Sequence, residues 1–503
     1  MAGREIKTLL MVPPLRMRDI ANEPYPPIGL SYIAACLEEN GFGVRILDAF
    51  SEGRENIGQE GDYFTVGLPE EAIRERLLEY KPDIVGISWN FTNFFDSRLQ
   101  IADLVKSTLP KCLVVLGGAH VTMEYRNSMD NPHVDLIVRG EGEHVMVEIA
   151  ERLKRGEPLH DIEGTVAKFE GKIVENPLRE LISDLDALPL PAYHLLKMDI
   201  YLRDQRKSIF PFAMRTPVGF MISSRGCHFN CIFCSTSKMF RKFRPRNPNR
   251  VVDEIEYLMK EYGVREIAFQ DDCFLGDLKN VKALCEEILK RKIDIKWSVP
   301  PGLPVWRAEE DLLKLMKSSG FYRVCFPIES GCEKTLKFIR KPVNLKKARE
   351  TIVSANRLGL WTYGNLVFGF PYETEDDIKD SFQYFLDSGL DMLSVYICQP
   401  YAGSDLYSVY KEEGLLKGGL KTGSYLFKTQ YDSKNLTADE LNSLRSEILS
   451  RFMRNRLFSL LTPRGLYLHL ISKIRSTEDL LYVIRILVQV VKASIRSHSL
   501  SYF

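Results

Sequence analysis

The chain has 503 residues, which is too long for a single hydrophobic core and predicts two or three domains. Lys and Arg number 68 and Asp and Glu 67, so the formal net charge of +1 gives no reason to expect a nucleic-acid-binding protein. The apolar fraction of 45% and the charged fraction of 27% exclude a disordered chain and a multi-pass membrane protein. Ten cysteines are too few for a disulfide scaffold, and the N-terminal Met1-Ala-Gly-Arg-Glu lacks the apolar run of a secretory signal. We therefore expect a cytoplasmic protein in a reducing compartment.

Residues 1–165 alternate short runs rich in Val, Ile and Leu with helical patterns, which indicates a doubly wound parallel sheet with helices on both faces. The expected strands are 7–12, 44–48, 83–88, 113–116 and 136–138. Ligands of such sheets bind beyond the carboxyl ends of the strands. Glycines follow two of these strands, in Gly117-Gly118-Ala-His120 and in Gly140-Glu141-Gly142. They permit a ligand to approach the backbone closely, although tight turns would explain them as well.

Residues 166–210 lose this periodicity and are expected to form a linker. From 211 to 410 strands and helices alternate again, in an α/β pattern of six units. The expected strands are 219–223, 266–270, 295–299, 323–328, 361–368 and 393–397. Six units are fewer than the eight of a closed barrel, so we expect an open, partial (β/α)6 barrel with its chemistry in the carboxyl-end loops.

Residues 411–503 read as a C-terminal helical region, in which Thr437-Ala-Asp-Glu440 forms a capping box. From Thr437 onward ten Lys and Arg residues outnumber five Asp and Glu residues. Between 480 and 496 the polar residues Arg485, Gln489, Lys492 and Arg496 fall on one helical stripe and leave a broad apolar face. Such a helix either packs on its own protein or lies on an anionic membrane surface, and its charges argue against a spanning helix.

Three cysteines stand in the first carboxyl-end loop of the second domain, in Cys227-His-Phe-Asn-Cys231-Ile-Phe-Cys234. Thiolates bind iron–sulfur clusters or zinc, and a cubane cluster held by three cysteines leaves one iron open to another molecule. Zinc remains an alternative with His228 as the fourth ligand, as do structural cysteines without metal. The other seven cysteines show no metal spacing, although Cys273 and Cys325 fall near strand ends that face this loop.

The C-x3-C-x2-C spacing after a first barrel strand resembles the radical S-adenosylmethionine (SAM) enzymes. The resemblance implies that Cys227, Cys231 and Cys234 bind a [4Fe–4S] cluster whose open iron chelates SAM, and that an electron cleaves SAM to a 5′-deoxyadenosyl radical. Further residues lie where that family contacts SAM: the aromatic residue before the third cysteine and polar or turn residues after later strands. They are Phe233, Asp271, Asp272, Glu329, Ser330, Gly369 and Glu373.

The doubly wound first domain, combined with this second domain, is similar to the cobalamin-binding subgroup of that family over roughly residues 5–410. The resemblance implies a cobalamin site at the carboxyl edge of the first sheet. Its expected residues are Ser88, Trp89, Gly117, Gly118, His120, Gly140, Glu141 and Gly142. The D-x-H-x-x-G string of many other cobalamin domains is absent from the sequence. We therefore expect no protein histidine on cobalt, and a hydrogen-bond or packing role for His120.

The resemblance implies an enzyme that functionalises an unactivated carbon, and C-methylation is the leading hypothesis. In the resembled methyltransferases one SAM supplies the radical and a second supplies a methyl group that cobalt passes to the substrate. A radical oxidative cyclase or ring-rearranging enzyme, of the anaerobic Mg-protoporphyrin cyclase type, is the alternative. A cobalamin and iron–sulfur protein for electron transfer or regulation is the second alternative. The implied partners are a small-molecule or lipid-like substrate and a reducing protein such as flavodoxin or ferredoxin, with no nucleic acid and with possible peripheral membrane contact through the C-terminal helix.

Overall fold

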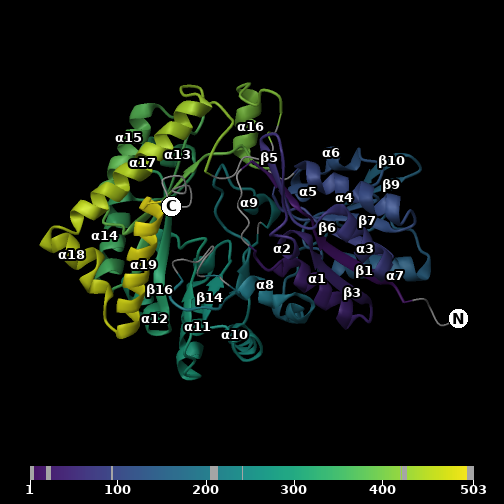
Figure 1. The fold of residues 1–503 in the computed structure, drawn as a ribbon, viewed down its shortest axis with the longest axis horizontal. Helices are drawn as coiled ribbons and strands as arrows, with labels where there is room; N and C mark the ends of the chain where they lie inside the picture. Colours follow the sequence, from purple (N-terminus) through teal and green to yellow (C-terminus); the bar gives the residue numbers. More distant parts are fainter. Residues whose placement is uncertain are drawn as a thin grey trace. The chain divides into compact units, whose positions relative to one another are not determined.

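The computed structural model describes residues 5–18, 24–91, 95–203, 205, 213–240, 242–419, 421 and 427–495; the side chains of 95–97, 487 and 489–495 are not described. The chain divides into two compact units (Figure 1). Unit 1 contains Met1–Arg203, Lys238–Phe240 and Leu420–Tyr425. Unit 2 contains Asp204–Ser237, Arg241–Gly419 and Leu426–Phe503.

Unit 1 is built on a seven-stranded sheet in the order β10-β9-β8-β7-β6-β1-β3. Five of its strands are parallel: β3 (Gly43–Asp48), β1 (Lys7–Val12), β6 (Ile84–Ser88), β7 (Leu113–Gly117) and β8 (Leu136–Val138). These are the five expected strands, each within one residue at either end. A small antiparallel sheet of β2 (Leu15–Met17), β5 (Tyr63–Val66) and β4 (Ile57–Glu60) lies outside the expected pattern.

Alternating side chains of the central strands separate two apolar layers in unit 1. Leu9 and Met11 pack on one face against α3 (Glu70–Tyr80) and α4 (Phe95–Thr108). Leu10 packs on the opposite face against α1 (Ile28–Glu39) and α7 (Glu143–Arg155). Because successive strand residues point to opposite faces, these runs of apolar residues produce a sheet that is covered on both sides.

The beginning of the expected linker is instead part of this sheet. Strands β9 (Thr165–Phe169) and β10 (Lys172–Glu175) form an antiparallel hairpin that extends the sheet past β8. Its two turn residues, Glu170 and Gly171, both have positive φ, as a tight hairpin turn requires. The outer strand β10 is short and mostly exposed, and it begins and ends with a charged residue, which suits an edge strand and makes the strand hard to identify from its sequence.

Unit 2 is an open sheet of six parallel strands in the order β11-β14-β15-β16-β17-β18. The strands are β11 (Val218–Met221), β14 (Glu266–Phe269), β15 (Lys296–Ser298), β16 (Phe321–Glu329), β17 (Trp361–Phe368) and β18 (Met392–Ile397). The helices that follow them in turn are α10 (Pro248–Tyr262), α11 (Leu278–Lys290), α12 (Glu310–Ser318), α14 (Leu345–Arg357), α15 (Glu375–Asp387) and α16 (Asp405–Glu412). This arrangement confirms the expected partial (β/α)6 barrel.

The C-terminal region is helical, as expected: α17 (Ala438–Ser459), α18 (Pro463–His469), the short 3₁₀ helix η6 (Ile471–Lys473) and α19 (Thr477–Ile495). The expected capping box is present, because Thr437 accepts from the amide of Glu440 and Glu440 accepts from the amide of Thr437. Within the described residues, no helix is long and apolar enough to span a bilayer.

Candidate functional site

The three clustered cysteines lie in one loop between β12 (Ser224–Arg225) and α9 (Thr236–Met239), just beyond the carboxyl end of β11. Cys227, Cys231 and Cys234 are all free and half-buried. Buried Ile232 fixes the loop to the barrel, since its amide donates to the carbonyl of Ile339 at 3.2 Å and its own carbonyl accepts from the amide of Leu406 at 2.8 Å. The fold therefore presents three thiols from an anchored loop at the edge of the sheet where barrel chemistry is expected.

The surroundings of the three thiols differ. A hydrogen bond from the Cys273 thiol lowers the pKa of Cys227 to about 7. Burial raises the pKa of Cys231 to about 11 and also raises the pKa of Cys234. Across the described residues, no group of three His, Cys, Asp or Glu side chains could hold a single metal ion. A cubane cluster has a different requirement, one thiolate for each of several irons, and this loop offers three thiols.

The two carboxylates that follow β14 bind the backbone that leads into the cysteine loop. Asp271 is buried and accepts hydrogen bonds from the amide and hydroxyl of Ser223, at 2.8 and 2.7 Å, and from the hydroxyl of Ser224 at 2.5 Å. Burial raises the pKa of Asp271 to about 6. Asp272 accepts from the amide of Gly226 at 3.2 Å, directly before the first cysteine. Both expected SAM contacts thus hold the backbone that leads into the cysteine loop.

Glu329 ends β16 in the left-handed region, with φ of 73°, and its carboxylate lies 2.8 Å from Nζ of Lys341. Both side chains are buried. Burial alone would lower the pKa of Lys341, but the nearby Glu329 carboxylate outweighs it and holds that pKa above its usual value. The ammonium group also lies 5.9 Å from the ring centre of Phe233. Lys341 thus connects two expected SAM contacts with the cysteine loop.

Lys341 is absent from the sequence-based site because nothing in its local pattern identifies it. It stands in the polar stretch Arg340-Lys-Pro before α14, where a charge is normally solvated. The Pro that follows it disfavours helix at this position and so predicts a loop, but it does not indicate a buried ion pair.

Ser330 and Glu373 both have their side-chain oxygens engaged inside the protein. The hydroxyl of Ser330 is fully buried, 2.7 Å from that of Ser381. Glu373 accepts from the amides of Gly369 and Phe370, at 2.7 and 3.1 Å, and from the hydroxyl of Thr335 at 3.1 Å. Burial raises the pKa of Glu373 to about 7.

These two residues therefore shape the turns after β16 and β17. Gly369 itself needs its positive φ of 83° to make the second turn. All the expected SAM contacts thus lie at or beyond the carboxyl ends of four strands of one sheet, β11, β14, β16 and β17. Several of them act there on the backbone of the loops.

In unit 1 the expected cobalamin residues gather after β6, β7 and β8. Trp89 is fully buried in the apolar core, and its ring centre lies 4.6 Å from that of His120. Burial, with a smaller effect of the nearby Arg98 charge, lowers the pKa of His120 to about 4. His120 is therefore a neutral, packed side chain at pH 7. Ser88 accepts a hydrogen bond from the side-chain amide of Asn90 at 3.3 Å.

The glycines beside these residues leave the backbone at the carboxyl edge of the sheet without side chains. Gly118 has φ of 117°, and a Cβ there would lie 2.6 Å from the side-chain oxygen of Asn90 and 2.7 Å from the carbonyl of Trp89. Gly140 has φ of 86° and faces open space, because no atom lies within 4 Å of where its Cβ would be. Glu141 accepts from the amide of Ile182 at 2.7 Å. The open space and bare backbone after β8 suit a large planar group that approaches the sheet edge closely. Gly117 ends β7, and Gly142 caps α7.

Comparisons with known proteins agree with both halves of this description. The family model for the radical SAM superfamily matches residues 221–385, and the model for the B12 binding domain matches residues 19–150. The chain is 32% identical over 437 residues to cytidylyl-2-hydroxyethylphosphonate methyltransferase of Streptomyces wedmorensis, covering 80% of each chain. The chain belongs to the cobalamin-binding radical SAM enzymes.

Other relatives in this family include methyltransferases and cyclases. The chain is 30% identical over 458 residues to the uncharacterized methyltransferase PH0819 of Pyrococcus horikoshii, covering 89% of this chain and 93% of the relative. It is 29% identical over 394 residues to the anaerobic magnesium-protoporphyrin IX monomethyl ester cyclase of Rubrivivax gelatinosus, covering 76% and 66%.

Among solved structures, the radical SAM methyltransferase TsrM of Kitasatospora setae with cobalamin and a [4Fe–4S] cluster bound has a similar fold. The TM-score is 0.64 at 18% identity, over 82% of this chain and 76% of that one. The family membership establishes an enzyme that uses a [4Fe–4S] cluster, SAM and cobalamin.

Proposed function

We propose that this enzyme transfers a methyl group from SAM to an unactivated carbon of a small molecule. The observation that carries the proposal is the extent of the match to methyltransferases, which covers 80% and 93% of two relatives' own lengths at 32% and 30% identity. The match to a cyclase covers 66% of that relative at 29% identity. Radical cyclisation or oxidation is therefore the second candidate function.

In this proposal Cys227, Cys231 and Cys234 hold the cluster, and SAM binds beside them. When bound, the cluster supplies the electron that cleaves SAM, and cobalamin supplies the carrier for the methyl group. The chain's own residues orient these groups: Asp271 and Asp272 fix the start of the cysteine loop, and Glu329 presents a carboxylate that suits the SAM ammonium group. The three thiols belong to one anchored loop, which supports the assignment.

The cobalamin contacts proposed in unit 1 are backbone and packing contacts. Gly117, Gly118, Gly140 and Gly142 let the cofactor approach the sheet edge, and Ser88 and Glu141 offer polar groups beside it. Trp89 and His120 support this edge from the core. The low pKa of His120 and its burial support a role without cobalt ligation.

We also propose that the protein is cytoplasmic and contacts a membrane only at the membrane surface. It would receive electrons from a small reducing protein such as flavodoxin or ferredoxin. Reductive cleavage of SAM consumes an electron, which the cluster must receive from a reductant before each cleavage. Anaerobic assays with a flavodoxin system in place of dithionite test the electron source. Turnover that depends on chemical reductant alone would contradict it.

The reaction type is tested with anaerobically reconstituted enzyme and SAM that carries a deuterated methyl group. Cytidylyl-2-hydroxyethylphosphonate and magnesium-protoporphyrin IX monomethyl ester, the compounds in the names of two relatives, serve as first probes. Methyl transfer predicts S-adenosylhomocysteine, 5′-deoxyadenosine and labelled product, all lost in Cys231→Ala. Turnover of a probe that releases 5′-deoxyadenosine without S-adenosylhomocysteine would contradict it and favour the cyclase.

A further inference from the structure

The C-terminal helices close one end of the barrel in unit 2. The guanidinium of Arg456, near the end of α17, donates to the carbonyl of Leu386 at 2.9 Å, shortly before β18. Nδ1 of His469, at the end of α18, lies 2.8 Å from Asp391, the residue immediately before β18. Both contacts are at the amino ends of the strands. We call residues 438–488 the C-terminal cap.

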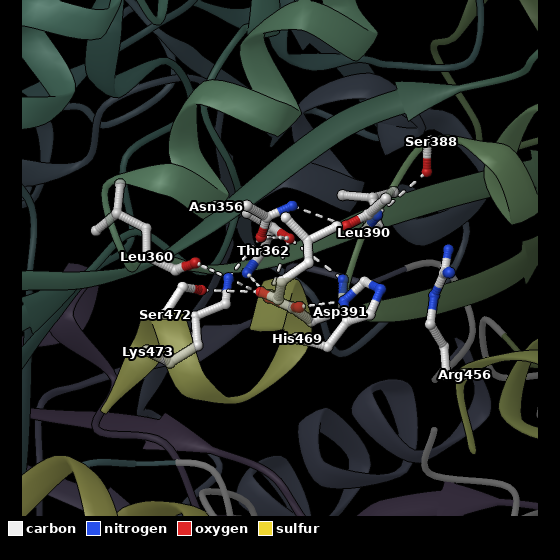
Figure 2. Close-up of polar contacts among 12 residues, drawn as sticks. Asn356, Leu360, Thr362, Ser388, Leu390, Asp391, Arg456, His469, Ser472 and Lys473 are labelled. Carbon is white, nitrogen blue, oxygen red and sulfur yellow. Dashed lines mark hydrogen bonds and ion pairs between the residues drawn. The ribbon is translucent and has the colours of Figure 1, made fainter. Parts of the chain in front are cut away.

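A buried polar network fastens the cap to the barrel (Figure 2). Nζ of Lys473 lies 2.8 Å from Oδ2 of Asp391 and 2.5 Å from the side-chain oxygen of Asn356, and it donates to the carbonyl of Leu360. Asp391 also accepts from the amide and hydroxyl of Thr362. Burial alone would raise the pKa of Asp391, but Lys473 and His469 outweigh it and lower that pKa. The cap is therefore a fixed part of unit 2.

The first half of α19 completes the cap across the amino ends of β16 and β17. Its side chains Tyr482, Val483 and Ile486 form one apolar cluster with Met214, Tyr322 and Trp361. The guanidinium of Arg485 donates to the carbonyl of Met214 at 3.0 Å. The sequence pattern predicts that Arg485 lies on a polar stripe of this helix, and in the structure Arg485 holds the helix on the barrel.

The outer side of the cap is unusually apolar. Of the 18 large apolar side chains exposed in the described part of the chain, nine belong to this short region. They are Leu457, Phe458, Leu461, Tyr467, Ile471, Leu480, Leu481, Ile484 and Val488. Three are 80%, 68% and 67% exposed: Leu461, Phe458 and Leu481. Soluble monomers rarely expose apolar side chains in such a group, and such patches mark interaction surfaces.

The exposed apolar side chains follow helical stripes. On α19, Leu481, Ile484 and Val488 recur every three or four residues, away from the buried positions Tyr482, Val483 and Ile486. At the end of α17, Leu457 and Phe458 follow the exposed Arg454 at helical spacing, and Leu461 lies in the turn just after the helix. Between α18 and the start of α19, the exposed large apolar side chains are Tyr467 of α18 and Ile471 of η6.

The charge around this surface is positive. Residues 450–495 contain eight Lys and Arg against two Asp and Glu, but Lys473 is buried against Asp391, and Arg456 and Arg485 bond to carbonyls of the barrel. Arg454 and Arg464 are exposed, and neither forms an ion pair with any residue that the structure describes. Apolar side chains rimmed by unpaired arginines match the boundary between acyl chains and anionic headgroups. A second copy of the same surface would instead bring like charges together.

We propose that the outer side of the C-terminal cap docks on an anionic lipid membrane. The surface lies at the amino ends of the barrel strands, whereas the cysteine loop lies at the carboxyl ends. Docking would therefore hold the enzyme at the membrane with the loop at the other end of the barrel. The proposal does not depend on methyl transfer and requires no lipid substrate.

The test is sedimentation of the reconstituted full-length enzyme with vesicles of phosphatidylcholine, with and without phosphatidylglycerol. The wild-type protein should bind only vesicles that contain the anionic lipid, and added salt should weaken the binding. Phe458→Glu/Leu461→Glu and Leu481→Glu/Ile484→Glu should each abolish binding. Arg454→Ser/Arg464→Ser should weaken it roughly 30-fold, since each cation near such a surface contributes about 1 kcal/mol. Leu178→Glu/Leu289→Glu, exposed side chains outside the cap, should bind like the wild type.

Thermal unfolding curves of all variants check that they fold, and the substituted side chains are exposed. Absence of wild-type binding, or equal binding to both kinds of vesicle, would overturn the proposal. So would self-association of the wild type that the cap variants abolish without any vesicle binding, because the surface would then join two copies of the chain.

Discussion

The ammonium group of Lys341 and the carboxylate of Glu329 form a buried ion pair, 2.8 Å apart, beside the cysteine loop. The pair joins the turn after β16 to the segment before α14, and Phe233 lies next to it. It thereby holds an expected SAM contact in a backbone conformation that residues other than glycine rarely adopt.

Removal of one partner of this pair should destabilise the protein strongly. Lys341→Met leaves the Glu329 carboxylate buried without its cation, and we expect the free energy of unfolding to fall by about 3–5 kcal/mol. The double variant Lys341→Met/Glu329→Gln removes both charges and should recover more than half of this loss. Urea unfolding measures both values. A double variant as unstable as the single one would show that the charges do not compensate each other.

Each of the three loop cysteines should be required for the iron–sulfur cluster. Cys227→Ala, Cys231→Ala and Cys234→Ala should each lower the iron and sulfide content after anaerobic reconstitution and reduce the cluster absorbance. Cys285→Ala is the matched control, because that buried thiol lies on α11, away from the loop. Full iron content in any of the three loop variants would contradict its role as a ligand.

Asp271 should stabilise the bound cluster indirectly, because it holds the backbone that leads into the cysteine loop. Asp271→Ala leaves the amide and hydroxyl of Ser223 without their buried acceptor, at a cost of about 1–3 kcal/mol. We expect faster loss of iron to a chelator and weaker SAM binding, measured by iron release and by electron paramagnetic resonance. Asp277→Ala, which removes a half-buried helix cap on α11, should cost about 1 kcal/mol without faster iron release.

Glu373 makes stability depend on pH. Its pKa of about 7 in the folded protein exceeds its ordinary value of 4.5, so the folded state binds the proton more tightly than the unfolded state. This group should therefore lower the free energy of unfolding by about 2 kcal/mol as the pH rises from about 5.5 to about 7.5. Glu373→Gln keeps acceptors for the Gly369 and Phe370 amides and cannot ionise, so its unfolding curves should lack this decline. An unchanged decline in the variant would assign it to another group.

The close contact between Gly118 and Trp89 should be needed for cobalamin to bind at the carboxyl edge of the sheet in unit 1. Gly118→Ala places a Cβ within 2.8 Å of backbone atoms of Trp89, at positive φ, and should reduce cobalamin loading measured from the absorption spectrum. Gly171 also has a positive φ, of 73°, but open space where its Cβ would be, so Gly171→Ala controls for the effect of placing a side chain at positive φ. Equal loss of cobalamin in the two variants would refute a specific effect of Gly118.

The sequence predicts the parallel strands well, because buried strands such as β6 and β17 are dense runs of apolar residues between turns. The linker predicted from residue 166 onward is wrong at its start, where the hairpin β9–β10 forms, because the outer strand is only four residues long and mostly exposed. For the site, local spacing identifies the cysteine loop, but it does not identify Lys341, whose role depends on contacts with distant residues. Position after a predicted strand also identifies Asp271, Ser330 and Glu373 as candidate SAM contacts. It does not show that their side-chain oxygens form hydrogen bonds within the protein.

The central claim is that this chain binds a cluster open to SAM together with cobalamin. The most direct measurement is the electron paramagnetic spectrum of the reduced, reconstituted enzyme with and without SAM, combined with iron and cobalt analysis of the same sample. We predict a [4Fe–4S]⁺ signal that SAM shifts and one cobalamin per chain. A signal that SAM leaves unchanged, or a cluster-loaded protein without cobalt, would contradict the account.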